Sequence, residues 1–98
     1  MTIHALTMPK IGLTMEEGTV AAWHIAEGQV VATGQHVADI EIEKSTNELE
    51  SPASGVLRRH TVTEGTMVPV GGLIGVIADA TVGDSEVEAF VAGFVPSV

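Results

Sequence analysis

Apolar and acidic residues alternate in two short runs that flank Lys44. The first run reads Asp-Ile-Glu-Ile-Glu at 39–43, and the second reads Thr-Asn-Glu-Leu-Glu at 46–50. Because alternation buries one face of each run and leaves the other in water, the pattern predicts two antiparallel strands with the lysine at or beside their reversal. A lysine in that place stands in solvent, within reach of an enzyme that modifies lysines.

The same pattern predicts further short strands separated by turn residues. The expected strands are 3–8, 18–25, 30–31, 36–43, 46–50, 56–62, 67–68 and 73–78. The loop at 10–17 carries the apolar residues Ile11, Leu13 and Met15, which need a reason to lie in an exposed loop. We expect one or two of them to fold under the loop as a lid on the core.

The chain contains an internal duplication. A shift of 37 residues lays 18–42 over 55–79 without a gap, and six of the 25 pairs are identical. These pairs are Gly18/Gly55, Glu27/Glu64, Gly28/Gly65, Val31/Val68, Gly34/Gly71 and Ile40/Ile77. The coincident glycines predict turns with positive φ. Two β units, each too small to bury its own apolar face, must close on one another, which predicts an all-β fold: a flattened β-barrel or sandwich of two small antiparallel sheets with internal pseudo-twofold symmetry.

The pattern changes after Asp79. Ser85 and Glu88 have the spacing of a helix-capping box. The apolar residues that follow on one helical face are Val87, Phe90, Val91 and Phe94. We therefore divide the chain into a domain at 1–80 and a tail at 81–98, which is a linker or a short amphipathic helix leading to a catalytic domain absent from this sequence. A helix of this length is marginal in water and needs a surface to pack against.

Composition narrows the range of functions. Ninety-eight residues make one small domain, and the absence of cysteine excludes disulfides, thiol nucleophiles and cysteine-ligated metals. A formal net charge of -9 argues against nucleic acid and anionic lipid and favours basic partners. The N-terminus lacks a signal-peptide pattern and the longest uncharged stretch, 65–78, is too short to span a bilayer, so a cytoplasmic protein is the default expectation.

Glu43-Lys44-Ser45, followed by Glu-Ser-Pro-Ala-Ser-Gly at 50–55, resembles the attachment turn of lipoyl domains. These are the carrier domains in the acyltransferase component of 2-oxo acid dehydrogenase complexes. Further matches are the opening at 8–20, Glu27-Gly28 and Glu64-Gly65, so the resemblance runs from Ile3 to Asp79. The run at 44–47 and the tail look most like the acyltransferase of acetoin-cleaving complexes.

The resemblance implies that Lys44 carries lipoate as a covalent amide, with Glu43 and Ser45 flanking it for recognition by a lipoate ligase or lipoyl transferase. The domain is then a carrier and not an enzyme. The lipoyl group on the Lys44 side chain then acts as a flexible arm. It carries acyl groups and reducing equivalents between a thiamine-diphosphate-dependent decarboxylase, an acyltransferase catalytic domain and dihydrolipoamide dehydrogenase. The residues that the resemblance assigns to partner recognition are Ile11, Leu13, Met15, Glu41 and Asn47. Asn47 departs from the apolar residue that many lipoyl domains have there.

Two other carrier or adaptor functions compete with this interpretation. A biotinyl carrier has a similar fold, but its lysine is flanked by methionines, whereas Glu43 and Ser45 flank Lys44. An unmodified adaptor, as in membrane fusion proteins, usually lacks the lysine.

Two groups of polar residues invite a catalytic or metal-binding interpretation. The histidines at 4, 24, 36 and 60 lack helical ligand spacing, so we expect no metal site and place them on strand surfaces or rims. The glutamates at 41, 43, 48 and 50 are not expected to act as paired catalytic carboxylates, because no apolar cleft is predicted to raise the pKa of any of them. We interpret them as a solvated acidic face that steers a basic partner toward Lys44.

Overall fold

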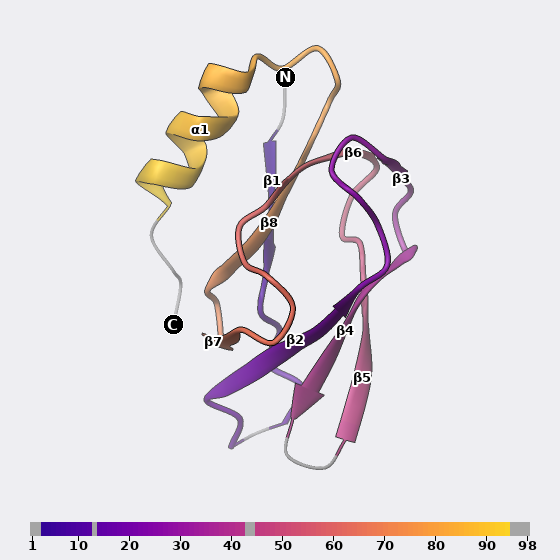
Figure 1. Ribbon diagram of the computed structural model, residues 1–98, viewed down its shortest axis with the longest axis vertical. Helices are drawn as coiled ribbons and strands as arrows, with labels where there is room; N and C mark the ends of the chain where they lie inside the picture. Colours follow the sequence, from indigo (N-terminus) through magenta and orange to yellow (C-terminus); the bar gives the residue numbers. More distant parts are fainter. Residues whose placement is uncertain (1–2, 13, 43–44, 95–98) are drawn as a thin grey trace.

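A computed structural model describes residues 3–12, 14–42 and 45–94. Its strands are β1 (Ile3–Thr7), β2 (Glu17–Trp23), β3 (Val30–Val31), β4 (His36–Ile42), β5 (Ser45–Glu50), β6 (Gly55–His60), β7 (Met67–Pro69) and β8 (Leu73–Ala78). They form two four-stranded sheets in the orders β1-β8-β6-β3 and β5-β4-β2-β7 (Figure 1). All strand pairs that the structure describes are antiparallel, and the predicted all-β sandwich of two small sheets is confirmed.

The strand registers repeat with the same offset of 37 residues as the sequence. Val20 pairs with Ile40 in the β2–β4 ladder, and Leu57 pairs with Ile77 in the β6–β8 ladder. Each ladder then shifts its register by one residue at the equivalent place. The short strands are exchanged between the units, since β3 pairs with β6 and β7 pairs with β2. The predicted pseudo-twofold symmetry is therefore confirmed down to individual residue pairs.

Two kinds of demand explain the coincident glycines. The φ angles of the turn glycines are 90°, 85°, 89° and 85° at Gly28, Gly34, Gly65 and Gly71. The prediction of turns with positive φ is confirmed there. It is wrong for Gly18 and Gly55, which lie at the starts of two strands rather than in turns, although Gly55 has a positive φ of 158°. A Cβ at Gly18 would lie 2.9 Å from Met8 Sδ, and one at Gly55 would lie 3.0 Å from Ala78 O. Close packing is the constraint at this pair.

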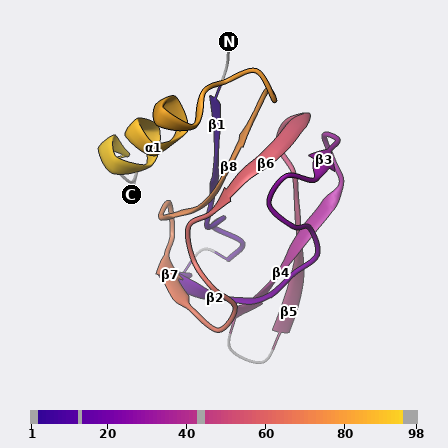
Figure 2. The same cartoon turned by 45° about the horizontal axis from the view of Figure 1, so that its top comes forward.

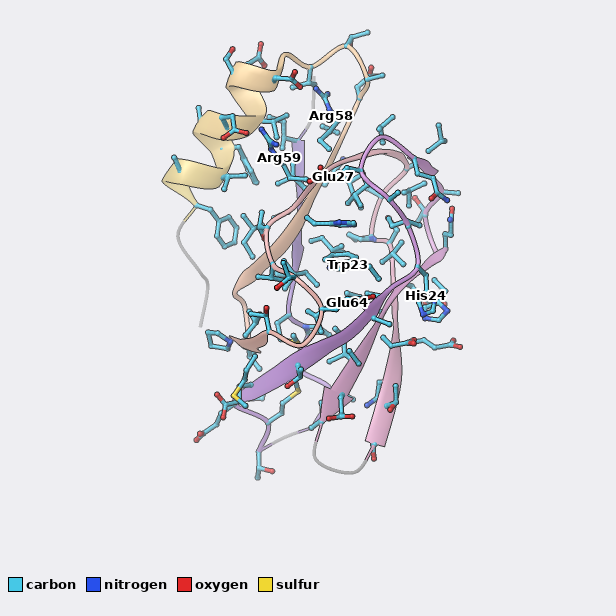
Figure 3. All side chains as sticks on the ribbon, viewed as in Figure 1. Trp23, His24, Glu27, Arg58, Arg59 and Glu64 are labelled. Carbon is cyan, nitrogen blue, oxygen red and sulfur yellow. The ribbon has the colours of Figure 1, made fainter. Side chains whose placement is uncertain are left out.

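Equivalent hydrogen bonds join the two units through the paired glutamates. Glu64 Oε2 accepts from the Trp23 backbone N–H, and Glu27 Oε2 accepts from the His60 backbone N–H, both at 2.8 Å. The rings of Trp23 and His60, which are themselves equivalent, stack with their centroids 4.2 Å apart. Figure 3 shows Glu27 and Glu64 on either side of Trp23. The identity of residues 27 and 64 thus reflects one hydrogen bond made twice.

The main core lies between the two sheets and is built from aliphatic side chains. Its largest fully buried members include Leu6, Met8, Val20, Ile40, Leu57, Ile74 and Ile77. A second apolar cluster lies on the outer face of the sheet that contains β8, where Val76 and Ala78 pack with Val82 and Val87. The helix α1 (Asp84–Gly93) covers this face (Figure 2). This packing supplies the surface that a short helix needs.

Two arginines of β6 anchor the helix from the side. Arg58 lies 2.8 Å from the carboxylate of Asp84, and its other nitrogen donates to Asp79 O, also at 2.8 Å. Arg59 pairs with Glu88 one turn further along the helix. Both arginines lie between β6 and α1 in Figure 3. Apolar packing and ion pairs therefore act on the same helix.

The predicted capping box is wrong. Gly83 is the N-cap residue, and no side chain in the described part of the chain caps the helix. Instead, the N–H groups of Glu86 and Val87 donate to Gly83 O at 3.0 and 3.1 Å. Ser85 lies inside the first turn because the helix begins one residue before it. The division of the chain at residue 80 into a carrier domain and a linker stays a prediction.

We expect Val87→Ala to lower the free energy of unfolding by about 1–2 kcal/mol, because burial of each CH₂ contributes about 0.8 kcal/mol. Val87 is only 1% exposed beneath the helix. The measurement is urea unfolding, with hydrogen exchange to locate the loosened helix. Val30→Ala is the matched control, since Val30 is 74% exposed. Equal costs for the two substitutions would contradict the burial of α1.

Candidate functional site

The hairpin of β4 and β5 frames the predicted attachment site. The last described pair of its ladder joins Ile42 to Ser45, and Ser45 and Thr46 are exposed. Glu43 and Lys44 fall between these paired residues in the sequence but lie outside the described residues. The paired strand ends lie at the opposite end of the molecule's long axis from the connection between β8 and α1 (Figure 1). The hairpin therefore points away from the C-terminal segment.

A groove runs beside the ends of β4 and β5. Its volume is about 550 Å³, and its walls come from the loop that precedes β2, the start of β2, the hairpin strands and β7. Of the residues predicted for ligase or partner recognition, those that line the groove are Ile11, Met15, Glu41, Ser45 and Asn47. The structure thus brings together residues that are more than 30 positions apart in the sequence. Leu13, predicted for the same role, lies outside the described residues.

The two described apolar residues of the loop have different environments. Met15 is partly buried and packs against the main core, and its Sδ accepts the Ile11 backbone N–H at 3.3 Å. Ile11 itself is 47% exposed, and Met67, which also lines the groove, is 59% exposed. The expectation that a loop residue covers the core is confirmed for Met15. Ile11 and Met67 leave apolar surface at the groove.

The predicted acidic face is solvated where the structure describes it. Glu41, Glu48 and Glu50 are exposed, and Glu43 lies outside the described residues. Asn47 pairs with the buried Ile40 and is half-buried. A polar amide thus occupies the edge of the core at a place where an apolar side chain would pack.

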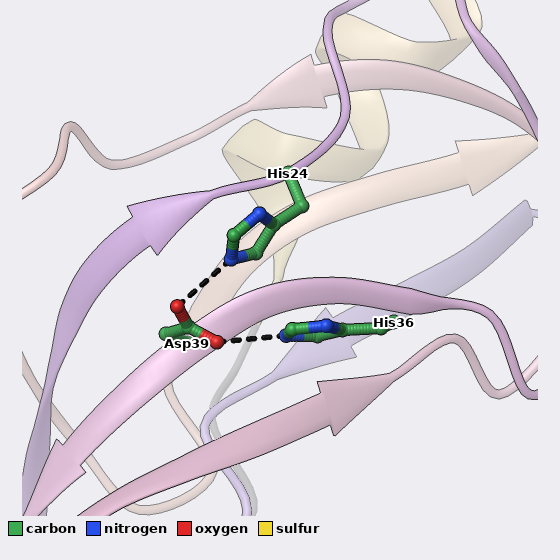
Figure 4. A group of neighbouring side chains, drawn as sticks. All are labelled: His24, His36 and Asp39. Atoms are coloured by element: carbon green, nitrogen blue, oxygen red, sulfur yellow. Dashed lines mark hydrogen bonds and ion pairs between the residues drawn. The ribbon is translucent and has the colours of Figure 1, made fainter.

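A second polar group gathers on the outer face of the sheet that contains β4. His24 Nε2 lies 2.8 Å from Asp39 Oδ2, and His36 Nε2 lies 2.7 Å from Asp39 Oδ1 (Figure 4). The two imidazole centroids are 4.4 Å apart. The hydrogen bond with His24 is the largest influence on the pKa of Asp39 and lowers it, with a further lowering by His36 and an opposing effect of burial.

Sequence reasoning missed this group. His24 is exposed and His36 is partly exposed. The expectation of no metal site was based on the lack of helical ligand spacing, which does not apply to strands. His24 follows β2 directly, and His36 and Asp39 lie on β4, which pairs with β2. The duplication gave no signal for this contact, because it relates 18–42 to 55–79 and does not predict which residues within 18–42 become neighbours.

We expect the stability advantage of Asp39 to be lost in acid. Its folded-state pKa lies below the ordinary 3.8, so the contribution is present above that pH and disappears as the pH falls through the folded value. Urea unfolding of the wild type and Asp39→Asn between about pH 2 and pH 6 measures this difference. The control is Glu41→Gln, which removes an exposed carboxylate from the same strand. A difference between wild type and Asp39→Asn that stays constant over this range would contradict the prediction.

Comparison with known proteins identifies the family. Residues 4–77 match the biotin/lipoyl-attachment family described as "Biotin-requiring enzyme". The structure resembles the solution structure of the lipoyl domain of the 2-oxoglutarate dehydrogenase complex from Azotobacter vinelandii, with 31% identity and a TM-score of 0.64, covering 76% of this chain and 95% of that one. This chain belongs to the lipoyl-domain family. Family members carry lipoate covalently on a lysine, so the predicted carrier class and cofactor are confirmed.

Curated relatives of this lipoyl domain are parts of larger proteins. The acetyltransferase components of the acetoin cleaving systems of Cupriavidus necator and Pseudomonas putida are 42% and 44% identical over 93 and 92 residues, which are 95% and 94% of this chain. The corresponding component of the pyruvate dehydrogenase complex of Rickettsia typhi is 34% identical over 88 residues, 89% of this chain. The chain spans 25%, 25% and 22% of these three relatives, respectively.

The same fold occurs in a carboxylase. A single-chain, multi-domain long-chain acyl-CoA carboxylase has a TM-score of 0.64 and 24% identity, covering 89% of this lipoyl domain and 8% of that chain. At that identity the likeness concerns the fold alone. Separately, none of the helices in the described part of the chain has the length and apolar character needed to cross a bilayer.

Proposed function

We propose that Lys44 is the lipoylated residue and that the domain carries acyl groups and reducing equivalents between the enzymes of one complex. The β4–β5 ladder carries this proposal, because it ends at the pair Ile42 and Ser45, the residues on either side of Glu43-Lys44 in the sequence. The exposure of Ser45 and Thr46 supports access by a modifying enzyme. Membership of the lipoyl family supplies the chemistry of attachment.

In this proposal the domain presents the lipoylated lysine to its partner enzymes and catalyses no reaction itself. A lipoate ligase or lipoyl transferase joins the carboxyl group of lipoate to Lys44 Nζ as an amide, with Glu43 and Ser45 beside it for recognition. Lipoate supplies the redox-active dithiolane and the acyl-accepting thiol. The paired strands β4 and β5 supply a rigid base, and the tether raises the effective concentration of the arm at each partner.

We assign the parent protein to the acyltransferase component of an acetoin-cleaving complex. Its relatives in two such systems are 42% and 44% identical over 95% and 94% of this chain. Pyruvate dehydrogenase components are 34% identical over 89% of it, or 42% identical over only 74% of it. The partners are then a thiamine-diphosphate-dependent decarboxylase, the acyltransferase catalytic domain and dihydrolipoamide dehydrogenase. The exposed glutamates at 41, 48 and 50 favour basic surfaces on these partners.

Modification in vitro tests the proposal. The chain is incubated with lipoate, ATP and lipoate ligase, and in parallel with biotin, ATP and biotin ligase, and intact mass is measured. We expect the mass of one lipoyl amide in the first reaction and an unchanged mass in the second. A biotinyl adduct alone would establish the rival carrier, and no adduct in either reaction would support the unmodified adaptor.

We also propose that the decarboxylase binds at the groove. We expect Ile11→Glu to reduce kcat/KM for reductive acylation of the lipoylated domain by about tenfold, which is equivalent to about 1.4 kcal/mol of interface energy. Ile11 is exposed at the groove, where a new carboxylate opposes apolar contact. Val30→Glu is the control, because Val30 is also exposed but lies on β3, away from the hairpin end (Figure 1). Lipoylation by the ligase should be equal in both variants. Equal loss of reductive acylation in the two would rule out a specific role for the groove.

A further inference from the structure

The face that carries His24, His36 and Asp39 has an exact counterpart in the other half of the duplication. A shift of 37 residues places Thr61, Leu73 and Val76 at the equivalent positions. Leu73 and Val76 belong to the apolar cluster beneath α1. One outer face of the sandwich is thus apolar and covered by a helix, whereas the other gathers imidazoles around a carboxylate in solvent. The other half forms its sheet without ligand-type residues at these positions, which leaves them available for a role besides their contribution to stability.

We propose that His24, His36 and Asp39 form a binding site for a divalent transition-metal ion such as Zn²⁺ or Ni²⁺. The three side chains offer two nitrogen ligands and one oxygen ligand, and their candidate atoms all lie within 4.8 Å of one another. A tetrahedral ion with bonds of about 2.0–2.1 Å holds its ligand atoms about 3.3 Å apart. The observed contacts of 2.7 and 2.8 Å, each to a different oxygen of Asp39, need to open by about half an ångström, and ligand atoms as far as 4.8 Å apart need to close by about 1.5 Å.

The backbone beneath these ligands is held by the sheet. The His24 N–H donates to Val37 O at 2.8 Å, and Asp39 pairs with Ala22 across the β2–β4 ladder. Both Nε2 atoms already point at the carboxylate (Figure 4), so an ion between them replaces a hydrogen-bonded proton on each ring. Binding then requires side-chain movements but no change of strand register.

The surroundings favour a cation. Glu48 Oε1 lies 3.9 Å from His36 Nδ1, the ring nitrogen that faces away from Asp39. A carboxylate beside the second nitrogen of a metal-bound histidine orients the ring and strengthens it as a ligand. The net charge of -9 gives the whole chain a negative potential, which also attracts a cation. The side chains of His24, His36 and Asp39 are 43%, 35% and 24% exposed, so water has access to complete the coordination.

The donor set predicts which ions bind. Imidazole ligands suit Zn²⁺, Ni²⁺ and Cu²⁺, whereas Mg²⁺ and Ca²⁺ prefer oxygen ligands. We therefore expect selectivity for the first group over the second. Because the ligands must be deprotonated, binding should release protons and weaken in acid.

The test uses the full chain without an affinity tag, titrated with ZnSO₄ and separately with MgCl₂ near neutral pH. Calorimetry should show one saturable Zn²⁺ site and no Mg²⁺ site, and NMR should show shifts of the His24 and His36 imidazole signals but not of the His4 signals. His24→Ala and His36→Ala should each weaken Zn²⁺ binding by at least about tenfold, since even an outer-shell partner is typically worth about 10–100-fold. His4→Ala should bind as the wild type does.

Thermal unfolding with and without ZnSO₄ gives a second readout, because an ion that binds only the folded state raises Tm. Asp39→Asn should lose most of that rise even if its own Tm is lower. Absence of saturable binding up to millimolar Zn²⁺ would overturn the proposal. So would binding that persists unchanged in both histidine variants, because the ion would then occupy the exposed carboxylates elsewhere.

Discussion

Replacing Lys44 with arginine should abolish lipoylation completely. Arginine keeps the positive charge and nearly the length of the side chain, but its guanidinium remains protonated and does not form the amide. A ligase reaction followed by intact mass measurement should show a full adduct on the wild type and none on Lys44→Arg. Reductive acylation by the decarboxylase should disappear with it.

Lys10→Arg is the matched control. Lys10 and Lys44 are the only lysines in the sequence, so the two substitutions together account for every lysine side chain. Lys10 is exposed in the loop after β1 and lacks the Glu-Lys-Ser context. Its variant should be lipoylated as fast as the wild type. An adduct on Lys44→Arg that peptide mapping places at Lys10 or at the N-terminus would refute the assignment of Lys44.

The parts of the fold that could be predicted are those that occur in both units of the duplication. Identical and apolar residues recur at an offset of 37, and the ladders β2–β4 and β6–β8 follow that offset, including the register shift after Val20 and Leu57. Periodicity placed the strands within a residue or two of their observed ends, because alternation depends only on which face is buried. The symmetry requires β3 and β7 to behave alike. The local sequence pattern does not show that each of them pairs with a strand of the other unit.

What could not be predicted depends on side chains from different strands. The His24 contact with Asp39 arises because β2 and β4 are neighbours and the ladder shifts its register between Val20 and Ala22. A search for helical spacing cannot find such a contact. The N-cap at Gly83 was missed for a related reason, since Ser85 suits an N-cap by type, whereas Val82 and Val87, on either side of the observed helix start, pack against Val76 and Ala78 of β8.

The hairpin that frames the candidate attachment site was predictable from sequence, because alternation ends one strand near Ile42 and begins the next near Ser45. The assignment of Lys44 stays a prediction. The groove beside the hairpin was not predictable. Its walls join the loop around Ile11 to Asn47 on β5 and to Met67 on β7. Met15 illustrates the ambiguity, because an apolar loop residue is equally suited to covering a core or contacting a partner. The structure assigns Met15 to the core and leaves Ile11 in solvent.

The symmetry predicts a matched pair of large stability losses. Ile40→Ala and Ile77→Ala should each lower the free energy of unfolding by about 2–5 kcal/mol, the usual cost of truncating a buried isoleucine. Both side chains are 0% exposed and lie in the core between the sheets. Because domains of this size have about 5–15 kcal/mol of total stability, either change should remove a large fraction of it.

Equivalence of the two positions makes the comparison more informative than either variant alone. Ile40 pairs with Val20 and Ile77 pairs with Leu57 at the same place in their ladders, so we expect the two costs to agree within about 1 kcal/mol, the spread allowed by different cavity relaxation. Urea unfolding measures both, with Ile11→Ala as the exposed isoleucine control. The contrary result is that Ile77→Ala loses as little unfolding free energy as Ile11→Ala, while Ile40→Ala loses the expected amount of about 2–5 kcal/mol. That result would mean that the two halves do not share one core. The hairpin beside Lys44 would then be supported by its own unit alone.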